Sequence, residues 1–303
     1  MMNFQSNDLT SILDQVRSEF NFEVVKRPLV GSLGSETVDT AWFGCFRNDS
    51  WRPVGPGSVK EGYCPHTTDD VVTLVEAAIG AFDRGVTNVV TDFNDGHFVK
   101  IMPSRETMKR IAGEDVVYPC LLVQAGYGGG GSFKCTLGLE RPLCSNMEIF
   151  ETVKSIKFCH KHTRNLRSRI SYLRESFAGL NEGWVNVGKA IDRAAATKVS
   201  IKEMVLAVYG EPSNTDRSRT MHMNRMEDIV KRLFSERHKG NYSQDVTDSD
   251  EANAWEMYNA IQGYQQHDAI QRGKRSELQR AILANNSPAV KTAERLLIPA
   301  LAA

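Results

Sequence analysis

The pattern of apolar residues changes near residue 150, and this change most constrains the fold. Before it, short β-rich runs alternate with turn residues. After it, apolar residues recur at the spacing of amphipathic helices. The sequence therefore predicts an α+β fold. We expect a mostly antiparallel sheet with one or two helices over residues 1–150 and a mostly helical region over residues 151–303, which together form one continuous globular unit.

Turn residues divide the N-terminal half into candidate strands. Asn94-Asp95-Gly96 is a favourable hairpin turn, because these residue types accept the left-handed backbone that tight turns need. The glycine run of residues 126–131 separates another pair of β-rich runs. The expected strands cover residues 22–30, 37–46, 86–93, 96–102, 116–125 and 132–139.

Apolar spacing and capping residues predict the helices. Thr67 or Thr68 begins one helix with Asp69 and Asp70 in its first turn, where acids suit the helix dipole, and Gly85 ends it. The other expected helices cover residues 7–20, 184–196, 201–209 and 214–238, a segment that starts at 163, a segment from the cap Ser249 to about 272, and one or two segments within 276–301.

Composition indicates a globular protein of a reducing compartment. The chain has 37 basic and 37 acidic residues and is 41% hydrophobic. No stretch approaches the ~20 apolar residues that span a bilayer, and residues 1–20 do not resemble a signal peptide. The six cysteines form no C-x-x-C pair. We therefore expect a cytoplasmic protein that has no cofactor and does not associate with membranes.

A cationic segment, residues 154–174, stands out in this neutral chain because it contains no acidic residue. Such segregation of charge suggests an anionic partner, and a nucleic-acid backbone is the leading candidate. The alternative is a solvated surface whose cations pair with glutamates elsewhere. The seven cations are Lys154, Lys157, Lys161, Arg164, Arg167, Arg169 and Arg174, and the glutamates of the alternative are Glu140, Glu148, Glu151 and Glu175.

A second group of cations lies within residues 217–239. Asp216, Glu227, Asp228 and Glu236 interrupt this group, so we interpret it as an exposed helix with its own salt bridges.

Two aromatic residues are candidates for stacking on bases. The glycine run lacks the Gly-Lys-Ser/Thr ending of a phosphate loop, and we interpret it as a flexible hairpin loop in which Tyr127 is exposed. Trp51 lies beside Arg47 and Arg52, and it is either a loop anchor or a second stacking residue.

Metal chemistry has weaker support in the sequence. Asp92, Asp95 and His97 surround the expected hairpin turn and could bind a divalent metal, although turn chemistry explains Asp95 equally well. His160 and His162 offer another option, yet their spacing from the cysteines matches no zinc motif. We therefore expect no metal site and no catalytic residue.

Several motifs resemble the phage- and plasmid-encoded proteins grouped as domain-of-unknown-function family 932. The resemblance spans roughly residues 40–300 and implies a mobile-element origin, a bacterial host and an α+β fold, but no activity. The glycines of residues 128–131 depart from the polar turn that the family has there. The similar segments are residues 253–264 with His267, 141–146 with an Arg-x-x-Cys-x-Asn pattern, 62–65, 160–169 and 288–293.

These observations lead to one hypothesis and two alternatives. We expect a non-enzymatic, phage- or plasmid-encoded protein that binds nucleic acid, in particular single-stranded DNA, in replication or recombination, and that could form a homo-oligomer. The alternatives are an interaction protein that binds a host factor and a metal-dependent enzyme. The expected phosphate contacts are Lys154, Lys157, Lys161, Arg164, Arg167 and Arg169, and the expected stacking residues are Tyr127 and Trp51.

Overall fold

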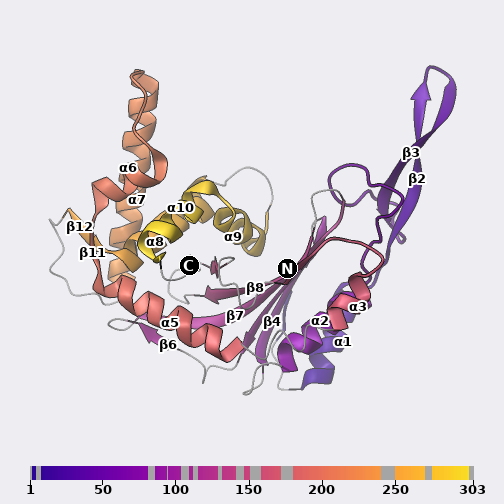
Figure 1. The fold of residues 1–303 in the computed structure, drawn as a ribbon, viewed down its shortest axis with the longest axis horizontal. Helices are drawn as coiled ribbons and strands as arrows, with labels where there is room; N and C mark the ends of the chain where they lie inside the picture. The colour runs from indigo at the N-terminus through magenta and orange to yellow at the C-terminus, as the bar shows by residue number, and fades with distance from the viewer. Residues whose placement is uncertain are drawn as a thin grey trace. The chain divides into compact units, whose positions relative to one another are not determined.

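The computed structural model divides the chain into two compact units that alternate along the sequence (Figure 1). Unit 1 comprises Met1–Glu106, Cys120–Leu137 and Lys154–Leu180, and unit 2 comprises Thr107–Pro119, Gly138–Val153 and Asn181–Ala303. The expected boundary at residue 150 is not tested by this division and stays a prediction. The described residues are 2–4, 8–80, 86–93, 95–103, 109–111, 115–128, 132–140, 147–150, 158–171, 180–239, 250–269 and 275–299.

The expected α+β fold is confirmed. The largest sheet has the strand order β1-β4-β5-β7-β8-β10, with β6 paired to β7 and β9 paired to β8. Five of its pairs are antiparallel: β1–β4, β4–β5, β5–β7, β6–β7 and β8–β10. The strands are β1 (Met2–Phe4), β4 (Val86–Phe93), β5 (Gly96–Pro103), β6 (Lys109–Ile111), β7 (Asp115–Gly126), β8 (Phe133–Glu140), β9 (Met147–Phe150) and β10 (Phe158–His160).

The hairpin predicted at Asn94-Asp95-Gly96 is confirmed, since Phe93 of β4 pairs with His97 of β5. Asp95 adopts a positive φ of 55°, which aspartate tolerates better than most residues. Gly96 is required for a different reason, because a Cβ there would lie 2.6 Å from the Cα of Gly126 on β7.

Two helices of unit 1 pack on this sheet and on each other: α1 (Leu9–Glu19) and α2 (Thr68–Gly80). Their apolar faces bury Val16 and Leu74 among strand residues such as Val99, none of which retains accessible surface. Asp8 caps α1 by accepting hydrogen bonds from the backbone N–H groups of Thr10 and Ser11. A short helix, α3 (Leu166–Ser171), also belongs to this unit.

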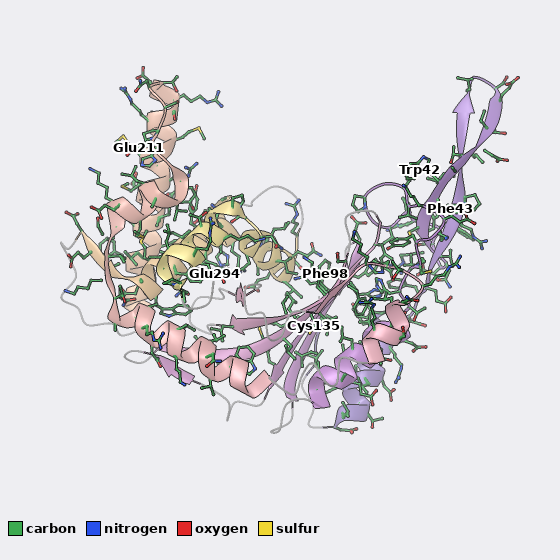
Figure 2. All side chains as sticks on the ribbon, viewed as in Figure 1. Trp42, Phe43, Phe98, Cys135, Glu211 and Glu294 are labelled. Atoms are coloured by element: carbon green, nitrogen blue, oxygen red, sulfur yellow. The ribbon has the colours of Figure 1, made fainter. Side chains whose placement is uncertain are left out.

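A second hairpin, formed by β2 (Val24–Leu33) and β3 (Glu36–Arg47), makes a separate two-stranded sheet in unit 1. Near its base, Phe43 bridges to Val59 and Phe46 bridges to Pro53. Figure 2 shows Trp42 and Phe43 at this position on the hairpin. Between Trp42 and the turn, the β2–β3 hairpin carries exposed apolar side chains, and Leu33 at the turn is 74% exposed.

Helices dominate unit 2, as expected for the C-terminal half. They surround α8, whose residues Trp255, Met257, Tyr258 and Ile261 are buried on every side of the helix. Besides β6 and β9, the elements of this unit in the part of the chain that the structure describes are α5 (Leu180–Ala196), β11 (Lys198–Ser200), α6 (Ile201–Tyr209), α7 (Asp216–Lys239), β12 (Glu251–Asn253), α8 (Ala254–Gly263), the π-helix η4 (Tyr264–Ala269), α9 (Glu277–Asn285) and α10 (Pro288–Leu297).

The start of α8 differs from the expected cap at Ser249, which lies outside the described residues. Asn253 is the cap: its side chain accepts a hydrogen bond from the N–H of Glu256, and the Glu256 carboxylate accepts one from the N–H of Asn253. The reason is tertiary, because residues 251–253 pair with β11 as strand β12 and the helix can begin only after them. No helix in the described part of the chain is long and apolar enough to cross a membrane.

Candidate nucleic-acid interface

The cationic segment belongs to unit 1, where its described part runs from the end of β10 into α3. Lys161, Arg164 and Arg169 are exposed. Lys154 and Lys157 lie outside the described residues, as do Arg174 and the side chain of Arg167. The predicted phosphate contacts can therefore be placed at three of six positions.

Lys161 and Arg164 make no ion pair with a carboxylate among the side chains that the structure describes. Cations that are exposed and unpaired keep their full charge available to an external anion. The four glutamates of the alternative explanation have side chains outside the described part of the chain. The solvated-surface alternative requires carboxylate partners for Lys161 and Arg164, and neither residue has one among the side chains that the structure describes.

Trp51 is presented on the surface by a strained turn. It is 59% exposed and has a φ of 54°, a left-handed conformation that is rare for a bulky residue. Two backbone hydrogen bonds hold this turn, from the N–H of Trp51 to the O of Arg47 at 2.9 Å and from the N–H of Arg47 to the O of Arg52 at 3.0 Å. Strain of this kind persists where the surrounding structure enforces it, and it often marks functional positions.

Arg27 extends this aromatic surface. Its guanidinium lies 5.6 Å from the centre of the Trp51 ring, within the range of a cation–π contact, and its side chain is exposed. Arg52 is also exposed beside the same tryptophan. Arg47 and Arg52 are near Trp51 in the sequence and were predicted beside it, whereas Arg27 was not predicted, because only the β2–β3 hairpin brings residues 27 and 51 together.

A backbone segment connects the hairpin to the cationic segment. The ammonium group of Lys26 on β2 donates to the carbonyl oxygens of Glu61 and Tyr63, the latter at 3.0 Å. One residue further, the N–H of Cys64 donates to the O of His162 at 3.2 Å. Because Lys161 precedes His162, residues 61–64 link the base of the hairpin to the start of the cationic segment within one unit.

Tyr127 was expected to be exposed, and this expectation is wrong. Its side chain is 1% exposed and its ring stacks on that of His66, with 4.1 Å between the ring centres. The chain leaves β7 only at Gly126, and a hydrogen bond from the N–H of Tyr127 to the O of Asp95 holds the residue against the β4–β5 hairpin. Tyr127 therefore cannot stack on a base in this conformation.

Tyr127 belongs to a buried cluster with His66, His97 and His162. His66 Nε2 and His97 Nδ1 lie 2.9 Å apart, and the Tyr127 hydroxyl donates to the carbonyl oxygen of His66 at 3.1 Å. Since that hydroxyl can then only accept at its 3.4 Å contact with His97 Nδ1, we assign the proton to Nδ1 of His97. This assignment makes His66 Nε2 the acceptor between the two rings.

Burial keeps all three imidazoles neutral. It lowers the pKa of His97 to about 3 and that of His162 to about 4. Burial also lowers the pKa of His66 well below its usual value, and a proton on His97 or His162 would lower it further by charge repulsion. The cluster was not anticipated, since its members are spread from residue 66 to residue 162 and only the sheet brings them together.

The metal site considered at the hairpin turn does not form in the part of the chain that the structure describes. Asp92 and His97 are buried, whereas Asp95 is exposed and accepts a hydrogen bond from the N–H of Gly55 at 3.1 Å. Among the described side chains, no group of three or more histidine, cysteine, aspartate or glutamate residues could hold a metal ion. The side chain of His160 lies outside the described part.

A comparison with protein families gives one match. A family model described as "Domain of unknown function (DUF932)" matches residues 56–286. No curated protein and no solved structure matches the chain. The matched region starts within the loop after Trp51 and includes the cationic segment, but not the β2–β3 hairpin.

Proposed function

Because this chain belongs to the DUF932 family, whose function is unknown, we propose a function from its own residues: it binds single-stranded DNA without acting as an enzyme. The supporting observation is the exposure of Lys161 and Arg164 without carboxylate partners among the described side chains, on the same unit as the exposed Trp51–Arg27 pair. The proposal includes a phage or plasmid origin and a role in replication or recombination.

The two groups of residues would recognise different parts of the strand. Lysine and arginine contacts to phosphates give affinity that depends on salt and not on sequence. An exposed indole stacks on any base, and each such contact is worth about 1–3 kcal/mol. Arg27 would support both kinds of contact, since its guanidinium already lies over the Trp51 ring.

We test the proposal by measuring the affinity for a dT20 oligonucleotide across a salt series. Each lost phosphate contact lowers the salt slope by about 0.7, so Lys161→Glu with Arg164→Glu should lower it by about 1.4. A matched control, Lys189→Glu with Lys202→Glu, reverses two exposed lysines of α5 and α6 and should leave the slope unchanged. Equal slopes in both double variants would remove the basis of the proposal.

The stacking component is measured with the same oligonucleotide. Trp51→Ala should weaken binding by about 1–3 kcal/mol at every salt concentration. Trp42→Ala is the control, because Trp42 is also exposed but has no arginine over its ring among the described contacts. If both alanine variants bind as the unmodified protein does, Trp51 does not stack on bases.

Self-association is a second part of the proposal and concerns the β2–β3 hairpin. A two-stranded ribbon is marginally stable in water, and its outer edges present unpaired N–H and C=O groups. Only another extended chain can pair with such an edge, and a second copy of the hairpin supplies one. The exposed apolar residues Val30, Leu33 and Val38 lie on the part that would be covered.

A further inference from the structure

Helix α7 has two halves with different surroundings. In the second half, Ile229 and Leu233 are buried in the core of unit 2, Lys231 pairs with Glu227 at 2.8 Å, and Arg232 pairs with Asp268. None of residues 216–224 in the first half is buried, and Met223 is 69% exposed. The expected salt-bridged helix is therefore found only in the second half.

The cations of the exposed half are placed against the helix dipole. Arg217 and Arg219 lie in the first turn, where the partial positive charge of the helix end favours acids and disfavours cations. Both side chains are exposed, and neither pairs with a carboxylate among the described side chains. Cations that destabilise the start of a helix and form no ion pair in return are expected at functional positions.

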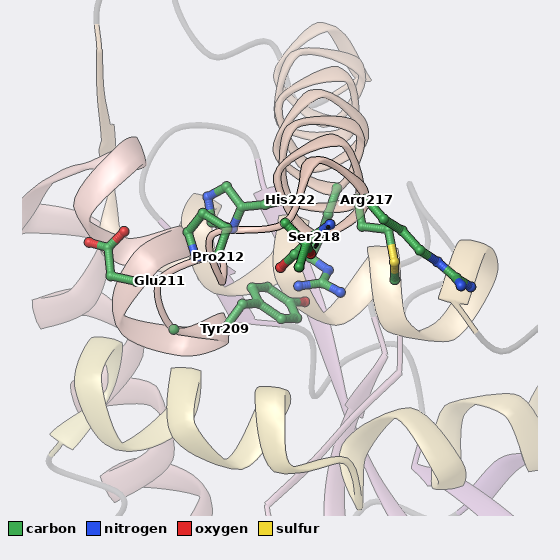
Figure 3. A pocket seen from close by; sticks show the side chains of 10 residues that line it. Tyr209, Glu211, Pro212, Arg217, Ser218 and His222 are labelled. Atoms are coloured by element: carbon green, nitrogen blue, oxygen red, sulfur yellow. Dashed lines mark hydrogen bonds between the residues drawn. The ribbon is translucent and has the colours of Figure 1, made fainter.

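One face of this half is anchored to the end of α6. Arg225 lies 4.5 Å from the centre of the Tyr209 ring, and both line a pocket of about 230 Å³ together with Ser218 and His222. Figure 3 shows this pocket, with Glu211, the only acidic residue that lines it, directed away from Tyr209 and Ser218. These contacts with the end of α6 therefore fix the orientation of this half of α7 within unit 2.

Hydrogen bonds make this anchor rigid. The hydroxyl of Thr215 accepts from the N–H of Ser218 at 3.2 Å, and the hydroxyl of Ser218 accepts from the N–H of Ser213 at 3.0 Å. The Tyr209 hydroxyl accepts from the side-chain amide of Gln265 on η4 at 3.0 Å. The exposed half is thus a positioned element of unit 2.

Helical geometry places the remaining side chains on three adjacent surfaces. Successive residues are rotated by about 100°, so Ser218, His222 and Arg225 share the anchored face, and Arg217 and Arg219 lie on its two flanks. The outward face between the two arginines carries Asp216, Thr220, Met223 and Asn224, all of them exposed, so one carboxylate stands among its polar and apolar side chains.

We propose that this half of α7 enters the major groove of double-stranded DNA, an inference that rests on the proposed role of the chain in binding DNA. A groove about 12 Å wide admits a helix, and its two walls are phosphate backbones. Arg217 and Arg219 would each contact one wall, and the outward face would meet the base edges. Asn224 matches the donor and acceptor pattern of adenine, and Met223 offers an apolar contact to thymine methyl groups.

The experiment compares three probes: a 20-base-pair DNA duplex, a 20-base-pair RNA duplex and dT20. We expect the unmodified protein to bind the DNA duplex. The double variant Arg217→Ala with Arg219→Ala should lower the salt slope of duplex binding by about 1.8, because each lost phosphate contact lowers this slope by about 0.9. The RNA duplex should bind more weakly, because its major groove is too deep and narrow for a helix. Binding of dT20 by the double variant should be unchanged.

Lys231→Ala is the matched control, since it removes a cation from the paired half of the same helix. Equal duplex binding by Lys231→Ala and by the double arginine variant would overturn the inference, as would equal affinity for DNA and RNA duplexes or no duplex binding at all. A different result would overturn the proposed function itself: no binding of dT20, or a salt slope of dT20 binding that Lys161→Glu with Arg164→Glu leaves unchanged. Equal melting temperatures would show that the variants are folded.

Discussion

At the scale of single residues, the buried histidines of unit 1 make stability depend on pH. Their pKa values are lowered in the folded protein, to about 3 for His97 and about 4 for His162, whereas unfolded histidine titrates near 6.5. As the pH falls below about 6.5, the unfolded chain binds protons that the folded protein excludes. The stabilisation is therefore complete above this pH and is lost as the pH falls through about 4 for His162 and about 3 for His97.

We predict that acidification from pH 6.5 to pH 4.5 lowers the free energy of unfolding by about 1.4 kcal/mol per pH unit for each of the three histidines. Urea titrations at several pH values measure this slope. His162→Leu should reduce the slope by about a third, whereas His222→Leu, outside the cluster, serves as the control. A pH-independent unfolding free energy over this range would contradict the assignment of neutral, buried imidazoles.

At the scale of elements, the start of α8 depends on one capping box in the centre of unit 2. Asn253 and Glu256 each satisfy a backbone N–H of the other residue at 2.8 Å and 3.1 Å. The helix they begin contributes several fully buried side chains to the core of this unit, including Trp255 and Tyr258. Loss of the cap should therefore affect the whole unit and not only the first turn.

We predict that Asn253→Ala lowers the free energy of unfolding by about 1 kcal/mol, the usual effect of losing a side-chain cap. Asn253→Asp keeps an acceptor oxygen and should retain most of the stability. Urea denaturation followed by tryptophan fluorescence measures the difference, because Trp255 lies in the helix that follows the cap. An alanine variant as stable as the aspartate variant would show that the capping box does not stabilise α8.

At the scale of the whole molecule, the β2–β3 hairpin determines whether copies can associate. Its exposed tip lies in unit 1, and its apolar side chains have no described neighbour that covers them. Lysine on a strand edge opposes pairing with another strand, since the pairing would bury its charge.

We predict that Val30→Lys with Leu33→Lys converts an oligomer to a monomer, as measured by light scattering coupled to gel filtration. Val185→Lys is the control, because Val185 is an exposed apolar residue of α5 in unit 2. A protein that is monomeric before any substitution, or an oligomer that survives the double substitution, would contradict self-association through the hairpin.

Local patterns in the sequence determined most of the elements of this protein. Helix α6 has the predicted bounds, and the turn at Asp95 joins the predicted strands, because capping, apolar spacing and turn chemistry act within a few residues. The exposure of Lys161 and Arg164 also agrees with the expectation from charge alone. Each of these features depends on near neighbours in the chain.

Only the tertiary structure decided which distant residues meet. It buried Tyr127 against His66, brought Arg27 to Trp51, and moved the cap of α8 to Asn253 by pairing the preceding residues with β11. It also separated the paired half of α7 from the exposed half that carries Arg217. The physical reason is the same in each case: burial and pairing depend on side chains far apart in sequence, and local periodicity carries no information about them.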